Sequence, residues 1–233
     1  MKFETAVKEA IPRTTDTCSF RFPRPDGLDY KPGQYMLVTI RSGDKELMHP
    51  FSLSSSPTDR GFVEFTKKLT TSEYSVRLRT MKPGEWTRID GPYGKFTCEG
   101  EYEKILFLAG GIGITPFHSI IKFCTDNRLP TSMVLFYGTR NENEIAFKKE
   151  LEDTQLKNPN FKLHYILNEP SPSWTGKTGF VTPDLIRQEA PDFKDRVFYA
   201  CGPPAMVIAM QKVVAALGLL VEQLRVESFV GHA

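Results

Sequence analysis

The sequence predicts two domains: a small antiparallel β domain, either a barrel or a sandwich, followed by an α/β domain built on a parallel sheet. The length of 233 residues suits one large domain or two of roughly 100 to 130 residues. Short extended segments between turn formers fill the first part, whereas apolar runs alternate with helical stretches from Lys104 onward. The two patterns meet near residues 99–103, which gives domains 1–100 and 101–233.

The extended segments of the first domain are separated by turns such as Pro32-Gly33, Asp59-Arg60-Gly61 and Pro83-Gly84. Their regular spacing is that of a small barrel or sandwich. The expected strands are Tyr35–Ile40, Phe51–Leu53, Phe62–Lys68 and Trp86–Ile89.

The apolar runs of the second domain predict a five-stranded parallel sheet, because each interval between them holds a plausible helix. The longest expected loop, 168–179, is rich in Pro, Ser and Gly. The expected strands are Ile105–Ala109, Met133–Tyr137, Phe161–Leu167, Val197–Ala200 and Leu224–Phe229.

Composition excludes several classes of protein. With 40% hydrophobic and 25% charged residues the chain is not expected to be intrinsically disordered. A net charge of +2 does not indicate a nucleic-acid-binding protein. No apolar run approaches the roughly 18 residues of a membrane span, and the N-terminus lacks the apolar core of a signal peptide, so we expect a cytoplasmic protein. The Cys and His residues are too scattered for a metal site; they are Cys18, Cys98, Cys124, Cys201, His49, His118, His164 and His232.

A glycine-rich turn joins the first apolar strand of the second domain to a helix. Gly110, Gly111 and Gly113 permit close backbone approach, Thr115 can cap the helix, and Pro116 suits its first turn. The free amides and positive end of such a helix favour a phosphate. A tight strand-to-helix turn with a purely structural role is the alternative.

A second such turn, Cys201-Gly202-Pro203, ends a later strand and opens another helix. Both turns fall at the carboxyl ends of parallel strands, where ligands of open α/β sheets bind. We therefore favour a site role for Cys201 over that of a small buried hydrophobic residue, the usual fate of a free cysteine.

In the β domain, the segment His49-Pro50-Phe51-Ser52 begins a stretch rich in hydroxyl groups, and a basic stretch that includes Lys67 and Lys68 follows it. These cations are suited to a pyrophosphate or an acidic partner, although a solvated barrel face explains them equally well.

Seven short motifs together resemble the ferredoxin–NADP reductase superfamily, and the resemblance covers essentially the whole chain. The variant His-Pro-Phe-Ser, in place of the usual Arg-x-Tyr-Ser, resembles the ferric reductase and NADPH oxidase branch. The motifs, in order, are Pro32-Gly33-Gln34-Tyr35, His49-Pro50-Phe51-Ser52, Gly91-Pro92-Tyr93-Gly94, Gly110 to Pro116, Tyr137-Gly138-Thr139-Arg140-Asn141, Cys201-Gly202-Pro203-Pro204 and Glu227-Ser228-Phe229.

This resemblance implies an N-terminal Greek-key β-barrel that binds FAD and an α/β domain that binds NAD(P)H. It places His49 at the FAD pyrophosphate, Phe51 on the isoalloxazine and Ser52 near flavin N5. Because His lacks the fixed charge and fork of Arg, pyrophosphate binding is expected to depend more on Lys67, Ser72 and Ser75, although Ser72 stands where the family has glycine. The implied FAD-binding set is His49, Phe51, Ser52, Leu53, Thr66, Lys67, Ser72, Ser75 and Phe229.

The resemblance also implies that the Phe229 ring covers the flavin face that nicotinamide must reach, and that Ser52, Cys201 and Glu227 surround the hydride path as the catalytic set. An edge strand with Phe229 in the core is the alternative. The implied NAD(P)H-binding set is Gly110, Gly111, Gly113, Thr115, Pro116, Gly138, Arg140, Glu144, Cys201, Gly202 and Pro203. We expect NADH rather than NADPH, because Glu144 repels a 2′-phosphate and Arg140 alone pairs it incompletely.

The implied function is a flavin-dependent reductase that takes hydride from NAD(P)H and passes electrons to a separate acceptor: a redox protein, a quinone, a flavin or a ferric chelate. Hydride transfer between cofactors needs positioning rather than a strong general base. A non-catalytic flavin- or nucleotide-binding regulatory subunit is the alternative, since His49 and Ser72 depart from the family pattern. FAD is expected as the flavin, with FMN left open.

Overall fold

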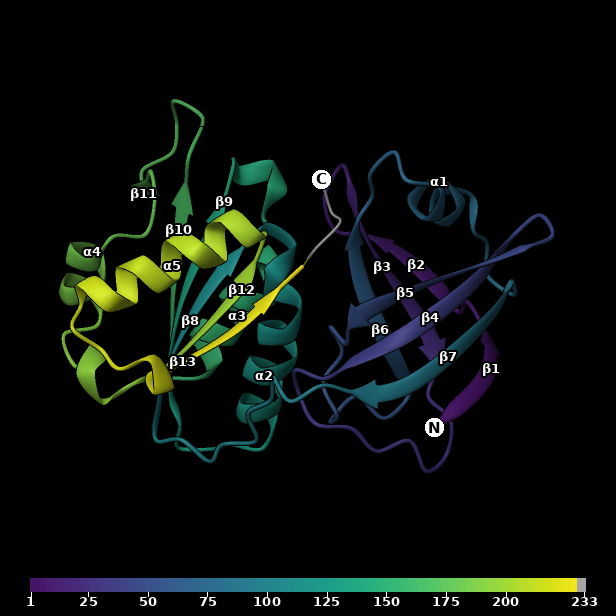
Figure 1. Ribbon diagram of the computed structural model, residues 1–233, viewed down its shortest axis with the longest axis horizontal. Coiled ribbons are helices and arrows are strands. Elements are labelled where there is room, and N and C mark those ends of the chain that lie inside the picture. Colours follow the sequence, from purple (N-terminus) through teal and green to yellow (C-terminus); the bar gives the residue numbers. More distant parts are fainter. Residues whose placement is uncertain (230–233) are drawn as a thin grey trace.

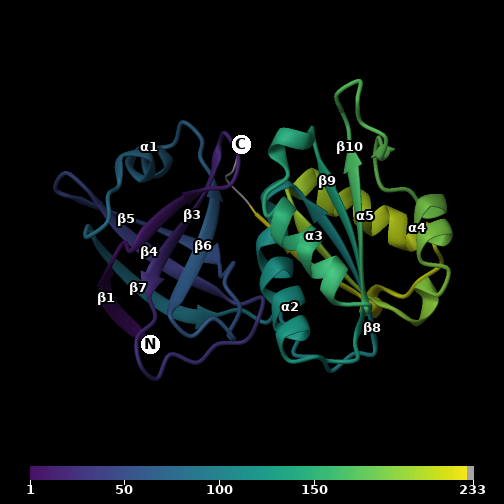
Figure 2. The same ribbon diagram turned by 180° about the vertical axis from the view of Figure 1, so that it is seen from behind.

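A computed structural model describes residues 1–229, with Val221 described by its backbone only; residues 230–233, and His232 with them, lie outside the described residues. A β-rich half and an α/β half lie side by side (Figures 1 and 2). The expected fold class, an antiparallel β-barrel followed by a parallel α/β domain, is confirmed.

The first half contains two antiparallel sheets, in the strand orders β1-β7-β4-β5 and β2-β3-β6. A bridge between Leu53 and Phe65 links β5 to β6 and so joins the sheets. The rings of Phe20 and Phe22 stack on Phe65 in the core between them. The strands are β1 (Lys2–Ala6), β2 (Glu9–Pro12), β3 (Thr17–Pro23), β4 (Tyr35–Ser42), β5 (Lys45–Ser52), β6 (Phe62–Lys68) and β7 (Trp86–Tyr93).

Several elements of this half are absent from the sequence-based prediction. Strands β1, β2 and β3 precede the first expected strand, β5 begins at Lys45 rather than Phe51, and the helix α1 (Glu73–Thr80) occupies part of the basic stretch. Strands β1 and β2 have no fully buried residue, so they lack the apolar signal that marks a core strand.

The second half has six parallel strands in the order β11-β10-β9-β8-β12-β13, so the expectation of five strands is wrong by one. The additional strand is the two-residue β11, which lies at the sheet edge within the segment expected to be a loop. The strands are β8 (Lys104–Gly110), β9 (Ser132–Thr139), β10 (Phe161–Leu167), β11 (Lys177–Thr178), β12 (Val197–Gly202) and β13 (Leu224–Ser228).

Helices cover both faces of this sheet. Helices α2 (Ile114–Asp126) and α3 (Lys148–Lys157) pack on the face toward the barrel, and α4 (Pro183–Glu189) and α5 (Pro204–Ala216) pack on the opposite face (Figure 1). Within residues 1–229, no helix combines the length and the apolar character that a membrane crossing requires.

Candidate functional site

The two glycine turns lie against each other, because β8 and β12 are neighbours in the sheet. A Cβ at Gly113 would lie 2.2 Å from the Cys201 carbonyl oxygen, and a Cβ at Gly202 would lie 3.1 Å from the Gly110 carbonyl oxygen. Gly111 has φ +51°, a conformation that glycine adopts most readily. Close approach and backbone conformation therefore account for these glycines.

The expectation that Thr115 caps the helix is wrong. A 3-10 turn, η1 (Gly111–Gly113), leads directly into α2, so Gly113 is the N-cap and no side chain caps the helix. Thr115 is already inside the first turn, and its hydroxyl donates to the Ile112 carbonyl at 3.1 Å. Pro116 occupies the first turn, as expected.

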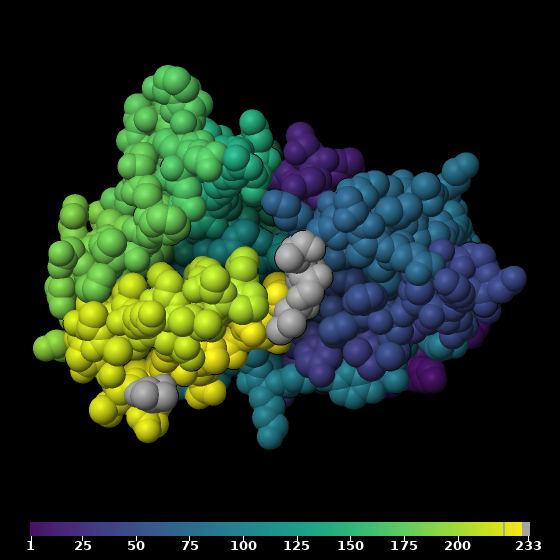
Figure 3. Space-filling model, turned by 45° about the horizontal axis from the view of Figure 1, so that its top comes forward, coloured from purple at the N-terminus to yellow at the C-terminus, as the bar shows by residue number. Residues whose placement is uncertain are grey.

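A narrow cavity of about 20 Å³ lies where the barrel meets the glycine turn. It is room for roughly one water molecule. Figure 3 shows the seam between the two halves, which the yellow C-terminal strand reaches. Six expected site residues line the cavity, together with Pro50 and Ile112, which are outside the expected binding sets; the six are Phe51, Ser52, Thr66, Lys67, Thr115 and Phe229.

Ser52, Cys201 and Glu227 come together beside this cavity. Cys201 and Glu227 are paired residues on the parallel strands β12 and β13, and the Ser52 side chain at the end of β5, which lines the cavity, interacts with the Glu227 carboxyl. Burial raises the pKa of Glu227 to about 7, and the Ser52 hydroxyl opposes that rise. Cys201 is completely buried, and burial together with Glu227 raises the pKa of its thiol well above the ordinary value, so it is not an activated nucleophile.

Two polar atoms of this group are buried without a properly oriented hydrogen-bond partner in the described part of the chain: Ser52 Oγ and Glu227 Oε2. Such atoms are costly unless a ligand or ordered water satisfies them. The Ser52 hydroxyl influences the Glu227 carboxyl, yet the contact lacks the geometry of a good hydrogen bond.

The barrel side of the site combines aromatic rings with a cation. The Phe51 ring is 6% exposed and stacks on Phe65 at 4.4 Å between centroids, and Lys67 Nζ lies 5.9 Å from the Phe51 ring centre. Burial lowers the pKa of Lys67 to about 8. His49 is exposed and lies edge-on to Tyr74 at 4.7 Å, and partial burial and Lys67 lower its pKa. His49 therefore contributes little fixed positive charge at neutral pH.

The other expected FAD residues have partners within the barrel. The Leu53 side chain is completely buried, while the Thr66 hydroxyl bonds those of Ser19 at 2.6 Å and Ser54 at 2.8 Å. Ser72 caps α1 by accepting from the Ser75 backbone N–H at 3.3 Å.

The expected nucleotide-specificity residues point to different partners. Gly138 lies near the end of β9, and beyond it the exposed Arg140 pairs with Glu169 at 2.8 Å. Glu144 instead reaches across to the barrel and pairs with Lys68 at 3.1 Å. Nothing in the sequence signals this contact, because the partners are 76 residues apart.

The kinds of side chain and backbone group in the site are those that a flavin and a pyridine nucleotide require. The unsatisfied polar atoms of Ser52 and Glu227, a buried cation and an aromatic wall converge beside two glycine turns. The cavity itself is smaller than a flavin ring.

Comparisons with known proteins agree with this chemistry. Residues 2–98 match the family described as Oxidoreductase FAD-binding domain, and residues 107–212 match Oxidoreductase NAD-binding domain. NADH-cytochrome b5 reductase 1 of Aspergillus fumigatus is 34% identical over 229 residues, covering 92% of this chain and 74% of that protein. The Dictyostelium discoideum protein of the same name is 32% identical, with coverages of 93% and 78%.

Solved structures share the fold. The cytochrome b5 reductase domain of Ulva prolifera nitrate reductase superimposes with a TM-score of 0.85 at 23% identity, covering 98% of this chain and 97% of that one. A ferredoxin NADP+ reductase from Neisseria gonorrhoeae, with bound FAD and NADP, gives a TM-score of 0.84 at 19% identity, with coverages of 97% and 98%.

Proposed function

The chain belongs to the ferredoxin–NADP reductase superfamily of flavin oxidoreductases, and from this premise we propose which of its residues carry the reaction. It is an NAD(P)H-dependent FAD oxidoreductase that prefers NADH and passes electrons to a separate acceptor. We assign FAD binding to residues 1–100 and nucleotide binding to residues 101–233. FAD supplies the ability to take up a hydride and release electrons one at a time.

The convergence of Ser52, Cys201 and Glu227 from both halves of the chain carries this proposal. The Ser52 hydroxyl offers an unsatisfied donor at the barrel side, and the buried Cys201 supplies a small apolar wall. Glu227, with its pKa raised to about 7, can both hold and release a proton near neutral pH. The protein thus contributes orientation, exclusion of water and one proton-bearing group.

Cofactor binding is divided between the two halves. The Phe51 ring and the Lys67 ammonium provide a stacking surface and a cation on the barrel side. The amides of the glycine turn at the start of α2 accommodate phosphate on the other side. Phe229 lines the cavity between them and must be displaced for nicotinamide to approach.

We assign the acceptor to the class of small haem redox proteins, because relatives that are more than 30% identical are named NADH-cytochrome b5 reductases. We also place the protein in the cytoplasm. Reconstitution with FAD or FMN, followed by assays with NADH and cytochrome b5, quinones, free flavins or ferric chelates, tests the proposal. Fastest turnover with cytochrome b5 supports it, and faster turnover with a small acceptor contradicts it.

A further inference from the structure

Helix α2 connects the nucleotide turn to the strand that faces the flavin site. Its N-terminus is the glycine turn, and its second turn contacts the backbone just after β5. His118 Nδ1 lies 2.8 Å from the Ser54 carbonyl oxygen, and the Ser119 hydroxyl donates to the Ser55 carbonyl oxygen at 2.7 Å. Both carbonyls lie within three residues of Ser52.

The orientation of the His118 ring is fixed on several sides. A carbonyl oxygen only accepts, so Nδ1 must carry the proton. The ring stacks on Phe147 at 4.0 Å between centroids with 19° between planes, and the Arg13 guanidinium lies 4.7 Å from the centre of the Phe147 ring. Only one tautomer and one ring orientation of His118 therefore satisfy the hydrogen bond to the Ser54 carbonyl oxygen.

The segment that His118 and Ser119 contact is rigidly attached to the barrel. The Ser54 N–H donates to the Glu64 carbonyl oxygen, and its hydroxyl donates to Glu64 Oε1, both at 2.8 Å. The Ser55 hydroxyl accepts from the Glu64 N–H at 2.9 Å. The segment is thus part of the barrel, and the two bonds from α2 tie the helix that follows the nucleotide turn to the backbone beside Ser52.

We propose that His118 and Ser119 are positioning residues that set the distance and angle between nicotinamide and flavin. This inference rests on the proposed function. Hydride transfer is sensitive to such placement: an error of about 1 Å can cost roughly 100-fold in rate. Their side chains act through the backbone of Ser54 and Ser55, without needing to touch either cofactor.

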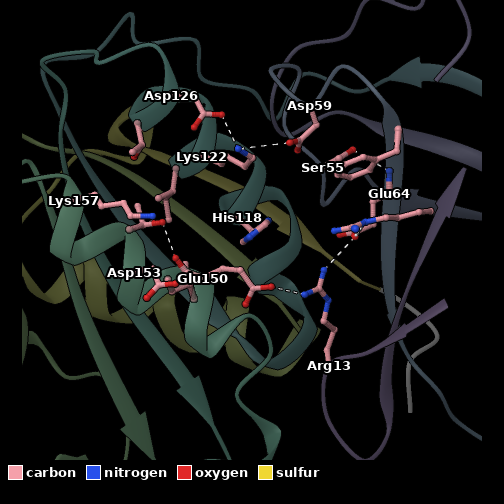
Figure 4. Close-up of a pocket in the computed structure, with 16 residues that line it drawn as sticks. Arg13, Ser55, Asp59, Glu64, His118, Lys122, Asp126, Glu150, Asp153 and Lys157 are labelled. Carbon is pink, nitrogen blue, oxygen red and sulfur yellow. Dashed lines mark hydrogen bonds and ion pairs between the residues drawn. The ribbon is translucent and has the colours of Figure 1, made fainter. Parts of the chain in front are cut away.

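Other contacts between the halves provide a control. A groove of about 300 Å³ separates α2 and α3 from the barrel, and His118 lies in it together with bridging ion pairs (Figure 4). Lys122, one turn further along α2, lies 3.5 Å from Asp59 of the barrel and 2.7 Å from Asp126. Such partly exposed pairs contribute little, and Lys122 bonds Asp59 and Asp126 rather than the Ser54 or Ser55 carbonyls. Asp59 also accepts from the Ser56 N–H at 2.9 Å, a bond that replacing Lys122 leaves in place.

The test compares His118→Leu, His118→Asn and Ser119→Ala with the control Lys122→Met. Anaerobic stopped-flow gives the limiting rate of flavin reduction and the NADH dissociation constant. Hydrogen exchange at the Ser54 and Ser55 amides, measured without nucleotide or flavin, reports how firmly this segment is held. Both amides donate to the Glu64 carbonyl oxygen, whereas His118 and Ser119 bind the carbonyls of the segment. In His118→Asn the side-chain amide nitrogen is bonded to Cγ, as Nδ1 is in His, so it can donate to the same Ser54 carbonyl oxygen.

We expect His118→Leu to lower the limiting rate about tenfold and Ser119→Ala about threefold, with the NADH dissociation constant changed less than twofold. His118→Asn should recover most of the rate, and Lys122→Met should match the parent. Exchange at the two amides should accelerate in His118→Leu and Ser119→Ala alone.

Unchanged rates in His118→Leu and Ser119→Ala would overturn the proposal, as would equal losses in His118→Asn and His118→Leu. An equal loss of the limiting rate in Lys122→Met would contradict a specific role of His118 and Ser119, because any contact between the two halves would then have the same effect. If His118 variants fail to fold, Ser119→Ala decides alone. A parent that NADH does not reduce would refute the proposed function, whereas unchanged exchange beside normal parental reduction would refute only the positioning role.

Discussion

Replacing Glu227 with Gln should change how the stability of the flavin-free protein depends on pH. Burial raises the pKa of Glu227 from 4.5 to about 7. The folded state therefore holds a proton that the unfolded state has already released between these values, so stability falls as pH rises from 4.5 to 7. The rise in pKa corresponds to about 3 kcal/mol, which should be fully lost above pH 7.

Urea unfolding between pH 4.5 and 8 measures this effect directly. At the lowest pH the parent and Glu227→Gln should have similar free energies of unfolding, and by pH 8 the variant should be more stable by about 3 kcal/mol. Glu222→Gln removes an exposed carboxylate near the same end of the chain and should show no such divergence. A parent-to-variant difference that stays constant across this range would show that the pKa of Glu227 is not raised in the folded protein.

Three further predictions concern the cofactors. Phe51→Ala removes a stacking surface worth roughly 1 to 3 kcal/mol and should weaken flavin retention through dialysis about tenfold or more; unchanged retention would remove Phe51 from the flavin site. Phe229→Ala should alter nicotinamide affinity in equilibrium titrations while leaving the fold intact, and unchanged affinity would place the ring in the core. Glu144→Arg should raise activity with NADPH but also lower the melting temperature, because it replaces the ion pair with Lys68 by like charges. A parent that uses NADPH as efficiently as NADH would contradict the role of Glu144.

How far the sequence predicts this fold depends on burial. The strands β8, β9 and β12 are buried on both faces and appear as continuous apolar runs, so they could be identified directly. Strands β1 and β2 lie at the surface and β11 has two residues, so none of them carries a comparable pattern. The helix α1 does have a local start signal, because Ser72 is a typical N-cap residue and the acidic Glu73 follows it in the first turn.

For the candidate site, motifs name the residues but not their contacts. The glycine turns follow from local sequence, because close backbone approach requires glycine whatever the ligand. The pairing of Glu144 with Lys68, and the bond from His118 to the Ser54 carbonyl, join distant segments through tertiary packing. Neither leaves a periodic or local pattern, so both required the structure.

The proposed hydride transfer can be followed in the visible absorption spectrum of the purified protein, reconstituted with FAD and titrated anaerobically with NADH. We predict a yellow protein whose flavin absorbance is bleached by about one equivalent of NADH, since one hydride reduces one flavin, and returns when cytochrome b5 is added. A protein that takes up no flavin, or a yellow protein whose colour persists in excess NADH, would contradict it and favour a non-catalytic binding subunit.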